Sequence, residues 1–392
     1  MERRTFLKIL SSAGIVSLVS PTFAMEVCKN KVSKSSSALL ESAFRNPPFS
    51  SGVYTWWHWM NGNITKDGIT RDLEAMKANG IAGYQLFEAG SGIPIGPVES
   101  LSDEWVDLIL HTLKESERLG LEFAMHNCPG WSSSGGPWIT PDKAMQIITW
   151  SETKITGGKQ VRIQLPTPKH MFDYYIDTYC LAIPANMKVI PRLSILELSN
   201  RLDKDGVLTW DVPTGEWLIM RFGQTAKDQK NKSAPSKSTG LDCDKFSTEA
   251  LDYHLNCMFK RLMPTMEKIA KHSKIGLLID SYETGDQDWT SDMPVYFEQS
   301  HGYELYPFLP VLANKIVESE ESTKRFLFDF RRVRADMFAE RYYGHFQKRC
   351  KEKGIITYTE PYGGNMMEEL QVAQQLDINM GEIGRASCRE RV

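Results

Sequence analysis

The chain has 392 residues, 41% of them apolar, which is enough for one large domain or for a barrel with an inserted module. Its 46 basic and 49 acidic residues leave a net charge of −3 with no basic stripe, which argues against nucleic acid as a partner. The seven cysteines stand singly and no histidine lies at metal-ligand spacing from them, so we expect no structural zinc site.

Residues 1–24 have the features of an export signal. Basic residues within positions 3–8 precede an apolar stretch over residues 9–19, and a small-residue cleavage site follows at 22–24. The order Arg-Arg-x-Phe-Leu-Lys resembles a twin-arginine signal, although an ordinary secretory signal would read almost the same. We expect a bacterial protein in the periplasm or outside the cell, with residues 25–45 as an N-terminal linker. No later stretch is long and apolar enough for a membrane span.

Six apolar runs each stop at a cluster of aromatic, amide, histidine or carboxylate residues. In a parallel β/α barrel all strands end on one face, so polar groups at these ends converge on one pocket. The pattern predicts an α/β fold with a (β/α)8-type, TIM-like barrel and an active site at the strand ends. The runs are residues 53–59, 81–87, 121–125, 275–279, 355–359 and 376–380.

Helical patterns separate the runs. Ile69, Leu73 and Met76 fall on one helical face, and Ser102 is placed to cap the next helix. A longer helix is expected to start near Ser322 and to end at Gly354. This alternation predicts barrel segments over residues 46–150 and 245–383.

The alternation breaks between the third and fourth runs. Residues 151–225 contain five short β-type runs separated by Pro, Gly and Asn/Asp turns, which predicts an inserted all-β module. The module would either bind carbohydrate or form one wall of the pocket. Residues 226–244 are polar and aperiodic and are expected to form a loop or linker.

The strand count falls short of a closed barrel. A barrel of this type needs about eight strands, and the pattern yields six, or seven if residues 217–222 belong to the barrel. Residues 384–392 show no hydrophobic pattern, and we expect them to form a tail that is foreign to the protein. The simplest interpretation is a barrel that is incomplete at the C-terminus, the front part of a longer protein. The alternative is a natural polar tail on a smaller open sheet.

Several strand ends carry carboxyl groups of the kind that glycoside hydrolysis requires. That reaction needs one protonated carboxyl to donate to the leaving oxygen and one ionised carboxylate to activate water or attack carbon. A single strand-end carboxylate is more often a salt-bridge or hydrogen-bond anchor, but several at corresponding positions favour chemistry. The candidates are Glu88, Asp280, Glu283, Glu360 and Glu382.

Aromatic residues surround these positions and offer flat apolar faces to sugar C–H groups. Asn, His and Glu side chains would hold the hydroxyls, although some of the rings belong to the core instead. The residues expected to bind substrate are His58, Trp59, Asn61, Glu88, His126, Asn127, Trp131, Asp280, Tyr282 and Tyr362.

Six sequence strings, in order along the chain, resemble glycoside hydrolase family 106. The resemblance covers roughly residues 45–383. The strings are Trp56-Trp57-His58-Trp59-Met60-Asn61-Gly62, Asp72-Leu73-Glu74-Ala75-Met76-Lys77, His126-Asn127-Cys128-Pro129-Gly130-Trp131, Asp280-Ser281-Tyr282-Glu283, Glu360-Pro361-Tyr362-Gly363-Gly364 and Met380-Gly381-Glu382.

The resemblance implies an α-L-rhamnosidase that acts on rhamnose-containing oligo- or polysaccharides, inverts the anomeric carbon and depends on Ca²⁺. Carried over by position, Glu283 matches the general acid and Glu382 the general base. Glu360 is the rival base; otherwise it would bind the metal or substrate hydroxyls. Asn61 and Asn127 could also supply calcium-type oxygens.

The sequence departs from the family pattern at Ile383, where an aromatic residue is expected. The missing strands put activity of this truncated chain in doubt, and an open barrel would expose an apolar edge that lowers solubility. Two other functions stay open at this point. One is a non-catalytic glycan-binding protein. The other is a metal-dependent polysaccharide deacetylase using His58 and His126, for which a third ligand is missing.

Overall fold

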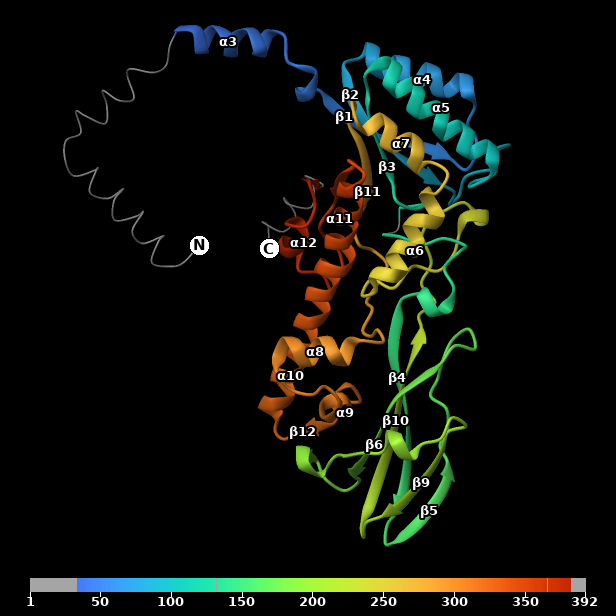
Figure 1. The fold of residues 1–392 in the computed structure, drawn as a ribbon, viewed down its shortest axis with the longest axis vertical. Coiled ribbons are helices and arrows are strands. Elements are labelled where there is room, and N and C mark those ends of the chain that lie inside the picture. Colours follow the sequence, from blue (N-terminus) through green and yellow to red (C-terminus); the bar gives the residue numbers. More distant parts are fainter. Residues whose placement is uncertain (1–33, 132, 365, 382–392) are drawn as a thin grey trace, which may run out of the picture.

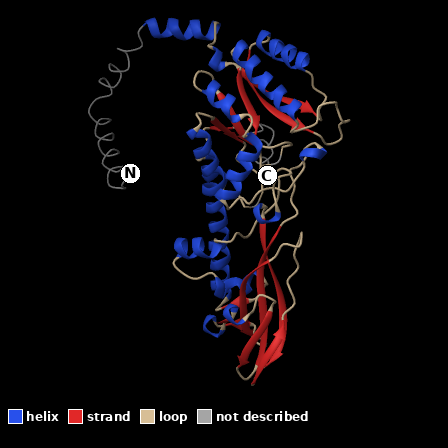
Figure 2. Ribbon diagram, turned by 45° about the vertical axis from the view of Figure 1, so that its right-hand side comes forward, coloured by secondary structure: helices blue, strands red, loops and turns tan. Residues whose placement is uncertain are grey.

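The computed structural model describes residues 34–131, 133–364 and 366–381. The expected export signal, Ile383, the tail at 384–392 and Glu382 lie outside this described part. The molecule is elongated, with a helix-covered parallel sheet at one end and long antiparallel strands at the other (Figures 1 and 2). Helix α3 (Lys34–Arg45), in the expected linker, stands apart from the body.

A six-stranded parallel sheet carries all six apolar runs, as predicted. Its strands are hydrogen-bonded in chain order, each to the next. They are β1 (Val53–Met60), β2 (Ile81–Ala89), β3 (Glu122–His126), β11 (Ile275–Ile279), β13 (Ile356–Thr359) and β14 (Ile378–Asn379).

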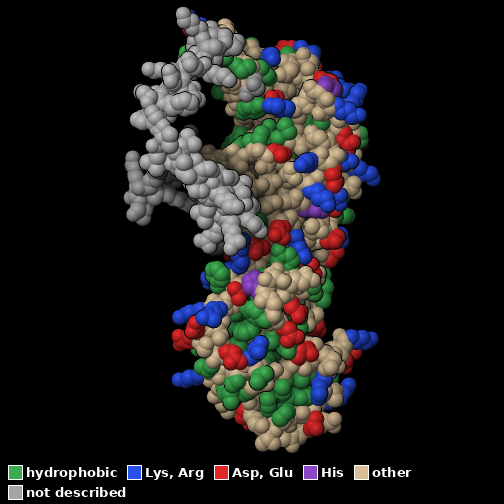
Figure 3. All heavy atoms as spheres, turned by 60° about the vertical axis from the view of Figure 1, so that its left-hand side comes forward, with side chains coloured by type: hydrophobic (Ala, Val, Ile, Leu, Met, Phe, Trp, Pro, Cys, Tyr) green, Lys and Arg blue, Asp and Glu red, His purple; other side chains and the backbone are tan. Residues whose placement is uncertain are grey.

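The sheet is open within the described part of the chain. β1 and β14 form its two edges and are not paired with each other. The α/β class is therefore confirmed, whereas the expected barrel is not closed by these strands. Edge strand β1 exposes Tyr54, Trp56 and Met60, and apolar side chains are visible on the surface at this end of the molecule (Figure 3).

Helices cover the outer face of the sheet (Figure 2). Ser102 caps its helix as predicted, accepting a hydrogen bond from the backbone N–H of Trp105. After α3, the helices of the described residues are α4 (Lys66–Ala78), α5 (Asp103–Leu119), α6 (Thr248–Phe259), α7 (Met263–Ala270), α8 (Met293–His301), α9 (Leu309–Leu312), α10 (Glu320–Met337), α11 (His345–Glu352) and α12 (Glu369–Ala373). Of these, α8 to α10 lie beside the antiparallel strands and not over the parallel sheet (Figure 1).

The long helix predicted before the fifth run is made of three segments. α10 is capped by Ser319, which accepts from the N–H of Ser322, and it passes through a π-helical stretch, Phe338–Gly344, into α11. Within the described residues, no helix has the length and apolar character that crossing a bilayer requires.

The two faces of the parallel sheet have different surroundings because side chains alternate along each strand. Trp57 and Trp59 point toward the helices, where Trp59 meets the ring of Trp105 edge-on at 6.5 Å between ring centres. Trp56 points to the inner face and donates its indole N–H to Gln85 at 2.9 Å. A small apolar cluster of Phe87, Ala124, Leu278 and Tyr358 fills the inner face.

The region predicted as an inserted module contains the expected strands. β4 (Gln146–Thr156), β10 (Glu216–Ala226), β6 (Ile176–Pro184) and β8 (Leu196–Glu197) form one antiparallel sheet in that order. A second, two-stranded sheet pairs β5 (Lys159–Gln164) with β9 (Val207–Val212). Residues 217–222, which were considered as a possible seventh strand of the barrel, lie in β10 of this antiparallel sheet.

This region has a small apolar cluster of its own, with residues from β6, β9 and β10, and it also contacts later parts of the chain. β7 (Val189–Ile190) pairs with β12 (Ile316–Val317), far along the chain. The ring of Tyr179 stacks on Tyr306 at 5.9 Å between ring centres. Side chains of β6 and β10 belong to the same core cluster as the helices over the parallel sheet. The antiparallel strands thus share part of their core with the helical part of the chain, and the inserted module stays a prediction.

Candidate active site

A cavity of about 260 Å³ opens at the carboxyl ends of the parallel strands. It lies where the strand-end argument places an active site. No residue of the region 151–225 is among those that line it, so the antiparallel strands do not form its wall. The lining residues are Trp56, His58, Phe87, Trp131, Asp280, Ser281, Glu283 and Glu360.

Three carboxyl groups share this cavity. Asp280 follows β11, Glu360 follows β13, and both are buried, whereas Glu283 is exposed at the rim. Burial and the neighbouring charges of Glu360 and Glu283, opposed by the backbone N–H of Ser281, together raise the pKa of Asp280 to about 7. The Asp280 carboxyl therefore takes up a proton more readily than an ordinary aspartate.

Hydrogen bonds orient the other two carboxyl groups. The Tyr362 hydroxyl donates to Oε2 of Glu360. Ser281 Oγ donates to Oε1 of Glu283 at 3.3 Å, and the Lys232 ammonium donates to the backbone carbonyl of Glu283 at 2.7 Å. Lys232 lies in a loop more than fifty residues earlier in the chain, so this loop helps to fix the segment that carries Glu283.

Aromatic rings form the opposite wall. His58 stacks on Phe87 with 5.5 Å between ring centres, and Phe87 contacts the ring of His126 at 5.2 Å. Burial lowers the pKa of His58 below its ordinary value, so this imidazole is neutral at neutral pH. With Trp56 and Trp131, the wall offers flat apolar surface facing carboxyl groups.

Asn127 and Tyr282 belong to the scaffold beneath the cavity. The Asn127 amide donates to the backbone carbonyls of Ser133 and Leu278, and its oxygen lies 3.0 Å from His254 Nε2. The Tyr282 hydroxyl donates to the carbonyl of Gly285 at 2.6 Å, and the tyrosine side chain is fully buried. The structure gives both side chains protein partners and does not place them on the lining.

Other sequence-predicted residues lie away from the cavity. Trp59 and Glu88 point to the helix side of the sheet, where Ser100 Oγ donates to Glu88 at 2.7 Å. Asn61 sits in a turn with φ of 50° and donates to the carbonyl of Ile93. His126 lies behind Phe87 with its Nδ1 beside the Cys128 backbone, and burial lowers its pKa to about 4.

The structure thus brings together His58, Trp131, Asp280, Glu283 and Glu360, with Tyr362 behind Glu360. Sequence reasoning did not select Phe87 or Ser281. Phe87 could have been found from its register, because it pairs with His58 across two parallel strands. Lys232 lies in an aperiodic polar segment and gave no sequence signal.

A buried ion pair supports the loop that follows β3. Lys245 and Asp242 are fully buried, and Lys245 Nζ donates to Asp242 and to Ser134 Oγ. Although burial alone would lower it, the charge of Asp242 holds the pKa of Lys245 above its ordinary value. The ammonium also lies 4.6 Å from the centre of the Tyr342 ring. The segment expected to be a linker therefore contributes a buried carboxylate, Asp242, which pairs with Lys245 and helps to fix the loop that follows β3.

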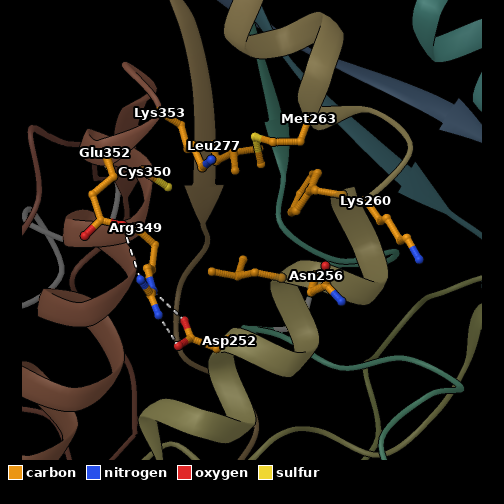
Figure 4. Close-up of a pocket in the computed structure, with 11 residues that line it drawn as sticks. Asp252, Asn256, Lys260, Met263, Leu277, Arg349, Cys350, Glu352 and Lys353 are labelled. Atoms are coloured by element: carbon orange, nitrogen blue, oxygen red, sulfur yellow. Dashed lines mark hydrogen bonds and ion pairs between the residues drawn. The ribbon is translucent and has the colours of Figure 1, made fainter.

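A second cavity, of about 330 Å³, lies among α6, α7, β11 and α11 (Figure 4). Its lining is mostly apolar, and its main polar feature is an ion pair in which Arg349 donates to both oxygens of Asp252. These charges are already neutralised by each other. This cavity has no set of converging carboxyl groups and is the weaker candidate for catalysis.

The described residues contain no group of three or more His, Cys, Asp or Glu side chains arranged to hold a metal ion. The deacetylase interpretation needed such a group around His58 and His126. The two rings instead lie on either side of Phe87.

Carboxyl groups facing aromatic rings at the strand ends of a parallel sheet form the site expected of a carbohydrate-cleaving α/β protein. A family model described as alpha-L-rhamnosidase matches residues 45–177 and 169–391, so the chain belongs to glycoside hydrolase family 106. A provisionally named beta-glucuronidase of Formosa agariphila is 41% identical over 374 residues, which cover 88% of this chain and 32% of that protein.

The fold has a counterpart among solved structures. A rhamnosidase from Novosphingobium sp. PP1Y matches with a TM-score of 0.79 at 23% sequence identity, over 86% of this chain and 49% of that one. This likeness confirms the fold. The chain spans about a third of the length of the Formosa relative and about half of the solved chain.

We predict that Lys245→Met destabilises the protein by about 3–5 kcal/mol, because it removes the positive charge that neutralises the buried Asp242 carboxylate. The double variant Lys245→Met/Asp242→Asn should recover part of this loss. Urea denaturation measures both. As a control, Lys353→Met breaks an exposed ion pair with Glu267 and should cost less than about 1 kcal/mol. The prediction is contradicted if the double variant loses as much free energy of unfolding as the two single variants combined.

Proposed function

We propose that this protein is an α-L-rhamnosidase that removes terminal α-L-rhamnose from rhamnose-containing oligo- or polysaccharides with inversion of the anomeric carbon. One observation carries the proposal. A sugar-sized cavity has the carboxyl groups of Asp280, Glu283 and Glu360 on one side and the rings of Trp56 and Phe87 on the other. Membership of family 106 supports the same activity.

The charge of the cavity favours a neutral sugar. The described residues that line it include three carboxyl groups and no lysine or arginine. A glucuronide carries its own carboxylate, which these groups would repel. Rhamnose is a neutral 6-deoxy sugar, and its methyl group can pack on the aromatic wall. The lining therefore favours a rhamnoside over the substrate that the name of the Formosa relative suggests.

Glu283 is proposed as the general acid. Its carboxyl lies at the exposed rim, where the glycosidic oxygen that links the sugar to its leaving group would sit. The acid protonates that oxygen as the C1–O bond breaks, and the leaving group departs as an alcohol. Water attacks C1 from the opposite side and gives its proton to the base. Glu382 is proposed as this base, with Glu360 as the rival.

Asp280 and Glu360 are proposed to hold sugar hydroxyls at the base of the cavity. A carboxyl with a pKa of about 7 can donate a hydrogen bond when protonated and accept one when ionised. Glu360 is oriented by Tyr362 and accepts. Such fixed polar groups would select the orientation of the ring.

Calcium is proposed to bind at Glu360. Carboxylate oxygens are the donors that Ca²⁺ prefers, and a divalent cation would relieve the repulsion between Glu360 and Asp280. Since the described residues hold no larger ligand group, sugar hydroxyls and water would complete the coordination. When bound, the ion would supply positive charge for substrate hydroxyls in an otherwise acidic cavity.

We further propose that residues 1–24 direct export to the periplasm or the extracellular space. We also propose that the six parallel strands belong to a (β/α)8-type barrel. The consecutive order of parallel strands is that of such barrels.

Glu283→Gln should lower kcat by at least about a hundredfold and leave sugar binding intact, because it removes the proton donor and keeps the shape. Release of 4-nitrophenol from 4-nitrophenyl α-L-rhamnoside by the full-length protein measures turnover, and calorimetry measures binding. Glu304→Gln, at an exposed position outside the cavity, is the matched control. Wild-type turnover in Glu283→Gln would refute the assignment. Binding without release in the unaltered protein would favour a glycan-binding function.

Substrate preference follows from the charge of the cavity. We expect kcat/KM for 4-nitrophenyl α-L-rhamnoside to exceed that for 4-nitrophenyl β-D-glucuronide by at least about a hundredfold at neutral pH. Parallel assays of one preparation measure the ratio. A higher value for the glucuronide would contradict the charge argument.

Calcium should raise the melting temperature of the full-length protein and tighten rhamnose binding, and Glu360→Gln should weaken both effects. Calorimetric titration with CaCl₂ after treatment with a chelator is the measurement. MgCl₂ is the matched control, because its small ion demands a rigid octahedral site. An identical response in the wild type and in Glu360→Gln would remove Glu360 from the ligand set.

A further inference from the structure

Residues 227–240 form a strap that lies against three of the strand-end loops. The strap folds back on itself, because the Asn231 side chain accepts from the backbone N–H of Gly240 at 2.8 Å and donates to the carbonyl of Ser238 at 3.1 Å. Asn231 is only 2% exposed. The segment is polar and aperiodic in sequence, but its backbone is closed by buried hydrogen bonds. It is therefore a compact, fixed loop and not a loose connection.

The strap holds the loops that follow β2 and β3. The N–H of Gly90, directly after β2, donates to the carbonyl of Ser233 at 2.6 Å. After β3, the N–H of Trp131 donates to the carbonyl of Lys232 at 3.3 Å. Gly130 has a φ of 81°, and a Cβ there would lie 2.1 Å from the same Lys232 carbonyl. The glycine permits this close backbone contact, and the next residue, Trp131, lines the cavity.

Two lysines of the strap hold the third loop, residues 283–286, which follows β11. The Lys232 ammonium donates to the backbone carbonyl of Glu283 at 2.7 Å, at the start of this loop. The Lys227 ammonium donates to the backbone carbonyl of Asp286 at 2.5 Å, at its end. We call these two charge-assisted bonds the lysine clamp. Both acceptors are main-chain atoms, so the clamp fixes the path of the loop while the Glu283 side chain lines the cavity.

We propose that Lys232 and Lys227 are positioning residues for acid catalysis, and that the lysine clamp sets the place of the Glu283 carboxyl. The proposal rests on the proposed function, in which Glu283 is the general acid. Glu283 is exposed, and the bond that Ser281 gives its carboxyl is long, at 3.3 Å. The position of the acid therefore depends on the loop backbone. A misplacement of about 1 Å can cost on the order of a hundredfold in rate.

Removing each ammonium tests the lysine clamp. Lys232→Met and Lys227→Met keep the aliphatic stem and delete the donor. In the full-length protein, each should lower kcat for 4-nitrophenyl α-L-rhamnoside roughly tenfold or more and leave KM nearly unchanged. Lys232→Arg should restore part of the rate. Lys230→Met is the matched control and should keep the wild-type rate, because Lys230 lies on the same strap but pairs with Asp228, at 3.7 Å.

The leaving group separates positioning of the acid from a general structural role. Methanol needs a proton from the acid in order to leave, whereas 2,4-dinitrophenol can depart as an anion. The kcat of Lys232→Met should therefore fall most for methyl α-L-rhamnoside and least for the 2,4-dinitrophenyl glycoside. Equal losses for the two substrates, or no loss for either, would overturn the proposal.

Hydrogen exchange tests the lysine clamp without any substrate. Bonded amides flank the loop, since the N–H of Tyr282 donates to the carbonyl of Tyr362 at 2.9 Å and that of Trp289 to the carbonyl of Gln146 at 3.3 Å. Peptides over residues 280–290 should exchange faster in both clamp variants than in the wild type and the control. Unchanged exchange would overturn the proposal. If the wild type cleaved no rhamnoside but the clamp variants exchanged faster, the proposed function would fail and the clamp would stand.

Discussion

Paired residues of a parallel sheet place their side chains on the same face, and this constraint positions every strand-borne group of the candidate site. His58 is opposite Phe87, and Leu278 is opposite both His126 and Tyr358. Because the six strands follow one another in the chain, each step along the sheet brings the next strand end to the same edge. Groups more than two hundred residues apart thereby share one small cavity.

The cavity brings three carboxyl groups close together, and neighbouring hydrogen-bond donors offset only part of the repulsion between them. Asp280 and Glu360 are both buried, and burial, followed by the charge of Glu360, raises the pKa of Asp280. Tyr362 and Ser281 donate to the carboxyl groups but carry no charge. The remaining repulsion can be relieved by a proton, by sugar hydroxyls or by a cation. A neutral, hydroxyl-rich ligand of the kind proposed above would add no further negative charge to this cavity.

Much of the fold could be predicted from the sequence, because hydrophobic periodicity follows local geometry. All six strands of the parallel sheet and the cap at Ser102 were recovered in this way. The shared core between the antiparallel strands and helices α8 to α10 was not, since the Tyr179–Tyr306 contact joins distant segments. The Lys245–Asp242 pair was missed for a related reason. A polar stretch reads as an exposed loop unless its burial by other segments is known.

The candidate site was predicted in part, and the reason lies in strand parity. Residues at the end of a strand alternate between the two faces, so a cluster that is compact in sequence is divided in space. Glu88 pairs with Trp59 and shares its helix-facing side, whereas Asp280 and Glu360 follow the inner residues Leu278 and Tyr358 by two positions. Counting along each strand in steps of two from an inner-facing residue assigns Asp280 and Glu360 to the inner face and Glu88 to the helix-facing side. The sequence alone would have allowed this assignment. Glu283 lies beyond the end of its strand, where parity no longer applies, and its placement at the rim depends on hydrogen bonds from Ser281 and Lys232.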